Sequence, residues 1–198
     1  MKWKTRAIIT CFILGITIVG VTMAFYSNKG VGLENVMTTE KSSVYLQEIF
    51  DPTDVWLSGE LKEKRVNFGN QGGKDQVIRF CVETQWLGEY EETWEPTSIN
   101  PVEIKWTSAL EQEWTTFPGD NWYYYKKVLS AGEETAEVMT GVLFSSKLSN
   151  DVAIEDFTHK TYKIVVRMEG LDVNKTITSV KWGKTFQESD GLSWSVSN

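Results

Sequence analysis

Residues 76–86 read QVIRFCVETQW, and this stretch shows the clearest structural pattern in the chain. From Ile78 onward, apolar or β-prone side chains occupy every second position, while polar side chains and one cysteine occupy the positions between them. A period of two indicates a β-strand, because successive side chains of a strand point to opposite faces of the sheet. One face is expected to carry Ile78, Phe80, Val82, Thr84 and Trp86, and the other Arg79, Cys81, Glu83 and Gln85.

Similar β-prone runs lie on both sides of this strand and are separated by turn residues. In one of them Val102, Ile104 and Trp106 alternate with charged residues, which predicts a strand with one wet face. No long amphipathic helix separates the runs. We therefore expect an all-β fold, a jelly-roll-like antiparallel β-sandwich with one or two short helices. Further strands are expected in 44–50, 64–73 with its closing Gly/Asn turn, 121–129, 138–144 and 162–169.

The sequence pattern leaves the secondary structure of two stretches undecided. Residues 150–157 could form one helical turn capped by Asn150 or Asp151, and residues 173–186 could form a helix or a final strand. The chain has no internal repeat and no low-complexity tract. One β-sandwich domain is therefore expected over residues 44–198.

Residues 1–30 have the features of an export segment. Lys2, Lys4 and Arg6 form a positive head, and an uncharged, largely apolar run follows as far as Asn28. Thr22, Met23 and Ala24 make a small-x-small cleavage site, which predicts a cleavable signal peptide over residues 1–24 and a mature chain that begins at Phe25. An uncleaved membrane anchor is the alternative, because the run is long enough to cross a bilayer. Both readings place the rest of the chain outside the cell.

The mature protein is acidic. Loss of residues 1–24 removes three positive and no negative charges, so the formal net charge falls from −7 to −10. This argues against nucleic acid as a partner. Cys11 would leave with the signal peptide, and Cys81 would be the only thiol left, so no internal disulfide is expected. Cys81 is expected to be a quiet, semi-buried thiol, with an intermolecular bridge as the alternative.

The residue types that usually carry catalysis are largely missing. The single histidine, His159, lies in a polar loop and belongs to no HExxH or other metal-binding motif. The glycine-rich stretch 69–73 lacks the ending of a phosphate loop. The glutamates in 89–95 are expected to form a solvated acidic loop and not a glycosidase pair. We expect no enzyme activity, no metal and no cofactor.

Tryptophan is abundant, with nine residues in the chain. Large aromatic side chains can fill an all-β core, or they can stack on sugar rings from an exposed face. Trp94 and Trp194 have the most polar surroundings, so they are the candidates for glycan stacking.

Residues 25–43 are polar, contain glycine and carry only a few spaced apolar residues. Such a stretch should not pack firmly alone. It is either a disordered leader or an extended arm that becomes a strand when it finds a sheet edge to pair with.

Four stretches together resemble the TasA/camelysin-like exported proteins of Gram-positive bacteria, including the biofilm surface protein branch. They are TMAFYSN at 22–28, VNFGNQGGKDQVIRF at 66–80, NWYYYKKVLSAGEET at 121–135 and YKIVVRMEGLDVNKTITSVKWG at 162–183. The resemblance spans nearly the whole chain, and none of these stretches is a catalytic motif. Part of the family is labelled peptidase, but a chain with one loop histidine and no metal-binding motif gives that activity no support.

The resemblance implies a jelly-roll subunit of extracellular fibres that is secreted after cleavage by a dedicated signal peptidase. In such fibres the arm of one copy adds as a strand to the next, so the expected partners are other copies of the chain, with other matrix components as further candidates. Val31, Leu33 and Val36 are the arm residues expected to fill pockets. A monomeric carbohydrate-binding module and a membrane-anchored surface protein are the alternative functions.

Overall fold

The computed structural model describes residues 43–50, 56, 59–96, 100–145, 157 and 159–197. Several predictions lie outside these residues. They are the signal peptide with its cleavage residues Thr22, Ala24 and Phe25, the arm residues Val31, Leu33 and Val36, and the helical turn considered for 150–156.

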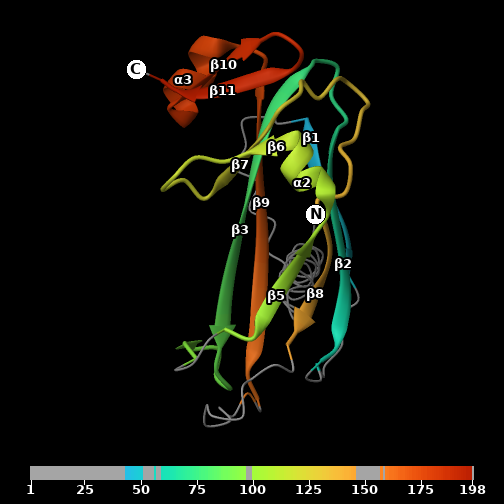
Figure 1. Ribbon diagram of the computed structural model, residues 1–198, viewed down its shortest axis with the longest axis vertical. Helices are drawn as coiled ribbons and strands as arrows, with labels where there is room; N and C mark the ends of the chain where they lie inside the picture. The colour runs from blue at the N-terminus through green and yellow to red at the C-terminus, as the bar shows by residue number, and fades with distance from the viewer. Residues whose placement is uncertain are drawn as a thin grey trace, which may run out of the picture. The chain divides into compact units, whose positions relative to one another are not determined.

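The first of the two main sheets has four antiparallel strands in the order β1-β2-β8-β5 (Figure 1). They span Val44–Phe50 (β1), Leu61–Asn70 (β2), Met139–Phe144 (β8) and Val102–Trp106 (β5). The β1–β2 pairing is regular, whereas the register shifts once between β2 and β8 and once between β5 and β8. This sheet therefore ends in β1 on one side and β5 on the other.

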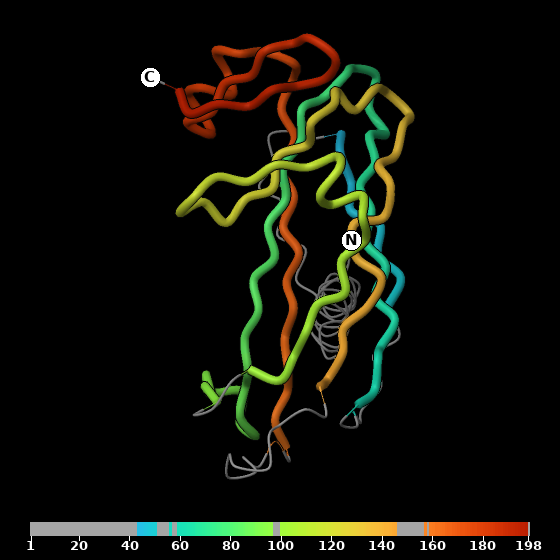
Figure 2. Tube along the Cα trace, viewed as in Figure 1, coloured from blue at the N-terminus to red at the C-terminus, as the bar shows by residue number. Residues whose placement is uncertain are grey.

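The second main sheet is built on the strand that the sequence pattern identifies most clearly. This strand, β3 (Gln76–Leu87), pairs along its whole length with β9 (Thr161–Asp172). The two run side by side through most of the molecule (Figure 2). On its other side β3 pairs with β7 (Trp122–Tyr125) and with the two-residue β4 (Thr93–Trp94), and β7 pairs with β6 (Trp114–Thr115).

The two sheets pack face to face through a first core that both supply. Phe68 of β2 lies 4.8 Å from Phe80 of β3 between ring centres, and Phe80 meets Trp114 edge-on at 4.7 Å. The alternation of 76–86 is confirmed because Ile78, Phe80 and Trp86 are buried, although Thr84 is exposed. The first core consists of Val44, Val66, Phe68, Ile78, Phe80, Trp114, Tyr125, Leu129, Val138, Met139 and Val166.

The last part of the described chain covers one end of the outer face of the second sheet. It consists of helix α3 (Lys175–Trp182) and the hairpin of β10 (Lys184–Glu188) and β11 (Leu192–Val196). These elements lie together at the top of Figure 1. They enclose a second core made of Val77, Tyr124, Trp182, Phe186, Leu192 and Trp194.

Local sequence explains how the stretch 173–186 divides between helix and strand. The Asn174 side chain accepts hydrogen bonds from the backbone N–H groups of Thr176 and Ile177, so it caps the start of α3. Gly183 ends the helix with a φ of 63°, a left-handed conformation that glycine adopts at little cost. The stretch is therefore a helix followed by a strand.

The described chain is mostly β, with antiparallel sheets and two short helices, as the sequence predicts. The second helix is α2 (Ser108–Glu113). The sequence reading did not anticipate α2, β4, β6 or the C-terminal hairpin. Neither helix in this part of the chain is long and apolar enough to cross a membrane.

Candidate functional site

Strand addition requires a sheet edge whose backbone groups are unpaired. Among the described strands, β9 is the longest that is paired on one side only, because its single partner is β3. The twelve residues of β9 pair with β3 without a register shift. The other edge of β9 is therefore regular and already has strand conformation before a further strand binds. This outer edge of β9 is therefore the main candidate surface for assembly.

The direction of the β9 backbone groups follows from hydrogen bonds at Gln76 of β3. Gln76 exchanges backbone hydrogen bonds of 3.0 and 2.9 Å with Leu129, on the side of β3 away from β9. Gln76 lies opposite Asp172, so this pair exchanges no backbone hydrogen bonds across the two strands, although the Gln76 Nε2 group donates to Asp172 Oδ1 at 2.9 Å. Because the pattern alternates, the β9 residues whose N–H and C=O groups point outward are Tyr162, Ile164, Val166, Met168, Gly170 and Asp172.

Three of these residues, at the centre of the edge, carry apolar side chains that face the interior. Ile164 and Val166 are buried, and Met168 packs against the first core. A strand added to the β9 edge would therefore place alternate side chains beside an apolar interior.

The edge strand β1 is different because a charged pair lies on its inner side. Glu48 of β1 forms an ion pair with Lys64 of β2, whose side chain is only 1% exposed. The Lys64 ammonium also lies 4.7 Å from the centre of the Phe50 ring. An inward-pointing charge is one way in which proteins protect an edge from unwanted pairing.

This buried pair predicts an unusual pH dependence. Burial lowers the pKa of Lys64 from its ordinary 10.5 to about 7. The contact with Glu48 favours the ammonium, but desolvation prevails. At a pH between these two values the unfolded chain holds a proton that the folded chain has lost, so stability rises with pH. We expect the free energy of unfolding to increase by up to about 1.4 kcal/mol per pH unit in this range.

Urea unfolding between about pH 6 and pH 7.5 would measure the onset of this rise, before the thiol of Cys81 begins to ionise in the unfolded chain. The control is Lys64→Met combined with Glu48→Leu, which removes both charges and should remove the rise. A rise of equal slope in this double variant would assign the effect to other groups.

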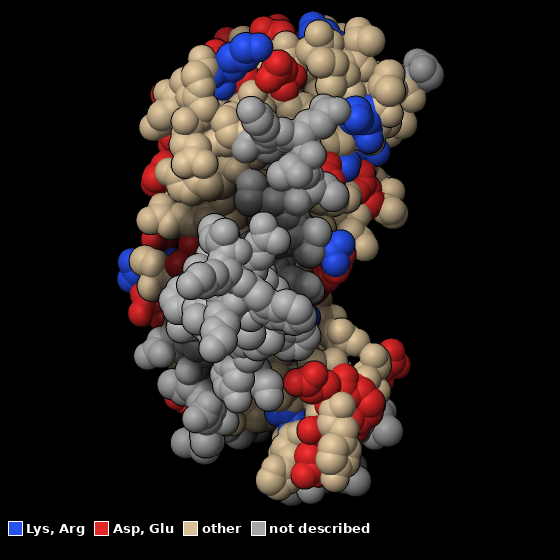
Figure 3. Space-filling model, turned by 180° about the vertical axis from the view of Figure 1, so that it is seen from behind, with Lys and Arg blue, Asp and Glu red and all other residues tan. Residues whose placement is uncertain are grey.

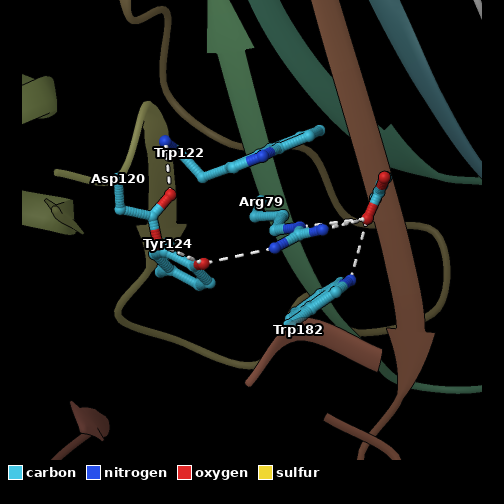
Figure 4. Close-up of polar contacts among 6 residues, drawn as sticks. Arg79, Asp120, Trp122, Tyr124 and Trp182 are labelled. Carbon is cyan, nitrogen blue, oxygen red and sulfur yellow. Dashed lines mark hydrogen bonds and ion pairs between the residues drawn. The ribbon is translucent and has the colours of Figure 1, made fainter. Parts of the chain in front are cut away.

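A second cluster of polar groups lies on the outer face of the second sheet, around Arg79 of β3. Its guanidinium lies between two indole rings, 4.1 Å from the centre of Trp122 and 4.7 Å from that of Trp182 (Figure 4). Arg79 Nε and Nη2 donate to one oxygen of Glu169 at 3.0 and 2.7 Å. Nη1 donates to the Tyr124 hydroxyl at 3.2 Å. The Arg79 side chain is 11% exposed.

The network continues from these contacts into the C-terminal elements. Trp182 Nε1 donates to the same Glu169 oxygen at 2.8 Å. The Tyr124 hydroxyl donates to Asp120 Oδ2 at 2.9 Å, and Lys184 Nζ lies 3.1 Å from this oxygen. We call the set of Arg79, Asp120, Trp122, Tyr124, Glu169, Trp182 and Lys184 the Arg79 cluster.

Charge and burial favour an ionised Asp120 and a protonated Tyr124 near neutral pH. Burial of Asp120 opposes its charge, but hydrogen bonds from the Trp122 backbone, Tyr124 and Lys184 outweigh burial and lower its pKa. Burial raises the pKa of Tyr124 to about 12. The acids and bases are paired with one another, and the contacts of Trp182 and Lys184 connect α3 and β10 to the second sheet.

Sequence reasoning did not identify this cluster, although three of the quoted stretches meet in it. Arg79 comes from 66–80 and Tyr124 from 121–135, while Glu169 and Trp182 both come from 162–183. Arg79 and Glu169 are 90 positions apart. Nothing in the local pattern of either stretch identifies the other as its partner.

The structure corrects the prediction for Trp194, which is buried in the second core and only 8% exposed. Its Nε1 donates to the Tyr125 carbonyl oxygen at 2.7 Å. The polar neighbours that suggested exposure, Ser193 and Ser195, lie on the opposite face of β11. Trp194 is therefore a core residue and not a platform for sugars.

Trp94 is half-buried at the other end of the sandwich. Its ring meets those of Trp86 and Phe157 nearly at right angles, at 5.9 and 5.4 Å, and the Lys160 ammonium lies 5.1 Å from its centre. A role in glycan stacking stays a prediction for this residue.

The remaining candidates are not brought together in one site. His159 is an exposed loop residue. The hairpin between β3 and β4 places Tyr90, 84% exposed, among exposed glutamates. Figure 3 shows acidic side chains gathered at this end of the molecule. Cys81 is buried, and burial raises the pKa of its thiol to about 11. Within the described ranges no group of three or more potential metal ligands forms a site.

No protein-family model, no curated protein and no solved structure matches the chain.

Proposed function

We propose that this chain is a secreted structural subunit of extracellular biofilm-matrix or surface fibres. In this proposal residues 1–24 are removed by signal peptidase, residues 25–43 form the arm, and residues 44–198 form a jelly-roll-like domain. The subunit carries out no chemistry of its own. The observation that supports the proposal most directly is the outer edge of β9, with which no described strand pairs.

The physical basis is that the edge of a sheet presents backbone N–H and C=O groups to which a further strand can bind. An added strand forms backbone hydrogen bonds along the edge, and its alternate side chains enter the interior. If each subunit gives its arm to the next and accepts the arm of the previous one, the contact is head-to-tail and does not close. The result is a fibre.

Removal of the arm is expected to abolish assembly. Residues 25–198 should form ordered fibres in electron micrographs and scatter light increasingly with concentration. Residues 44–198 should remain monomeric under the same conditions, because the donated strand is missing. Circular dichroism must show that the shorter chain keeps its β-structure.

A matched pair of variants tests the apolar arm residues without shortening the chain. Replacing Val31, Leu33 and Val36 with asparagine should prevent fibres, whereas replacing Thr38, Thr39 and Glu40 with serine should leave them intact. Monomers in every condition, for the unaltered mature chain as well, would contradict assembly from a single component.

A carbohydrate-binding module is a second candidate function, and Trp94 supports it. Of the two residues proposed for glycan stacking, Trp94 is partly exposed and Trp194 is buried. Under this function Trp94→Ala should abolish retention on a glycan column. The anchored alternative predicts that Met1 is still present on membrane-bound protein.

A further inference from the structure

We infer that the outer edge of β9 is the edge that accepts the arm, and that its occupant is a segment of residues 25–43 from a second copy of this chain. This inference rests on the proposed function and assigns its acceptor. The assignment comes from a comparison of the edges that the described strands leave open.

The first sheet offers two poorer edges. β1 has seven residues and carries the Glu48 side chain on its inner side, held by the buried Lys64. A strand added beside β1 would therefore bring its inward side chains next to a charged pair, which is unfavourable for apolar residues. β5 has five residues, and its ladder is irregular between Lys105 and Trp106.

The β9 edge has none of these features. It offers outward backbone groups at every second position from Tyr162 to Asp172, and its ladder with β3 has no register shift. Inward side chains at its centre, those of Ile164, Val166 and Met168, are apolar. A long, straight edge with an apolar inner side is the type that pairs readily with another chain.

The arm has a sequence that matches this edge. It is longer than β9, and Val31 and Leu33 are two positions apart, so both can face the interior in one strand. Gly32 and Glu34 then lie on the outer side, where Arg167 of β9 is 41% exposed and pairs with Glu83. Glu34 would add a second carboxylate beside this guanidinium. Val36 is out of phase with this pair and does not take part in the match.

Disulfide trapping between two copies of the chain, each with one added cysteine at a different position, tests whether β9 is the acceptor edge. One mature chain carries a single added cysteine in the arm, at Gly30, Gly32 or Glu34 in separate variants. The other carries Arg167→Cys on the outer face of β9. Matched acceptors are Ile49→Cys on β1 and Glu103→Cys on β5, which are also exposed positions. Native Cys81 should not interfere because it is buried and its thiol pKa is raised.

We expect fibres that contain a disulfide between an arm cysteine and Arg167→Cys, with this product lost when the acceptor is Ile49→Cys or Glu103→Cys. Three results would overturn the inference while leaving assembly intact. The first is a disulfide in the fibres between the arm cysteine and Ile49→Cys or Glu103→Cys. The second is a disulfide that forms only when the arm cysteine and Arg167→Cys are in the same chain. The third is a dominant disulfide between two copies that both carry Arg167→Cys. Absence of fibres from the unaltered mature chain would instead contradict the proposed function itself, and the acceptor assignment with it.

Discussion

Trp194→Ala is expected to lower the free energy of unfolding by about 4 kcal/mol, the usual scale for removing a buried tryptophan. The indole packs against Tyr124 at 5.2 Å, Trp182 at 6.0 Å and Phe186 at 5.2 Å between ring centres. Its loss would leave a cavity between the C-terminal hairpin and the second sheet. The Tyr125 carbonyl would also lose the hydrogen bond from the indole. Urea unfolding followed by circular dichroism measures the change.

Trp94→Ala is the matched control, because the same side chain is removed from a half-buried position. Its loss of stability should be clearly smaller, since less apolar surface returns to water. Equal losses in the two variants, or a Trp194 variant as stable as the parent, would contradict the burial described for Trp194.

Arg79→Met is expected to lower the free energy of unfolding by about 3 kcal/mol, because removing one partner of a largely buried ion pair leaves the other charge uncompensated. Methionine keeps the length of the side chain but not the three hydrogen bonds to Glu169 and Tyr124. Trp122 and Trp182 would also lose the cation that lies between them.

Arg167→Met provides the comparison for this change. Arg167 also pairs across β3 and β9, with Glu83, but both side chains are about half exposed. An exposed pair of this kind contributes little, so this variant should lose less than about 1 kcal/mol. Equal effects of the two substitutions would show that the Arg79 cluster does not hold α3 and β10 on the sheet.

Local pattern was sufficient for the strands that have one buried face. The alternation in 76–86 identifies β3, and the alternation in 102–106 places Trp106 against the first core. The stretch 173–186 could not be assigned from periodicity, because a short helix capped by Asn174 leads directly through Gly183 into β10. The two-residue strands β4 and β6 are too short to leave any periodic signal.

By itself, the sequence determined the mostly β character of this protein, because the side-chain period of a strand is a local property of the chain. Only the tertiary structure decided that no described strand pairs with the outer edge of β9, that Trp194 is buried and that Lys64 faces the interior. Each of these depends on which distant segment lies alongside. Arg79 and Glu169 illustrate the reason: each strand can be recognised alone, but their contact exists only after β3 and β9 have paired in register.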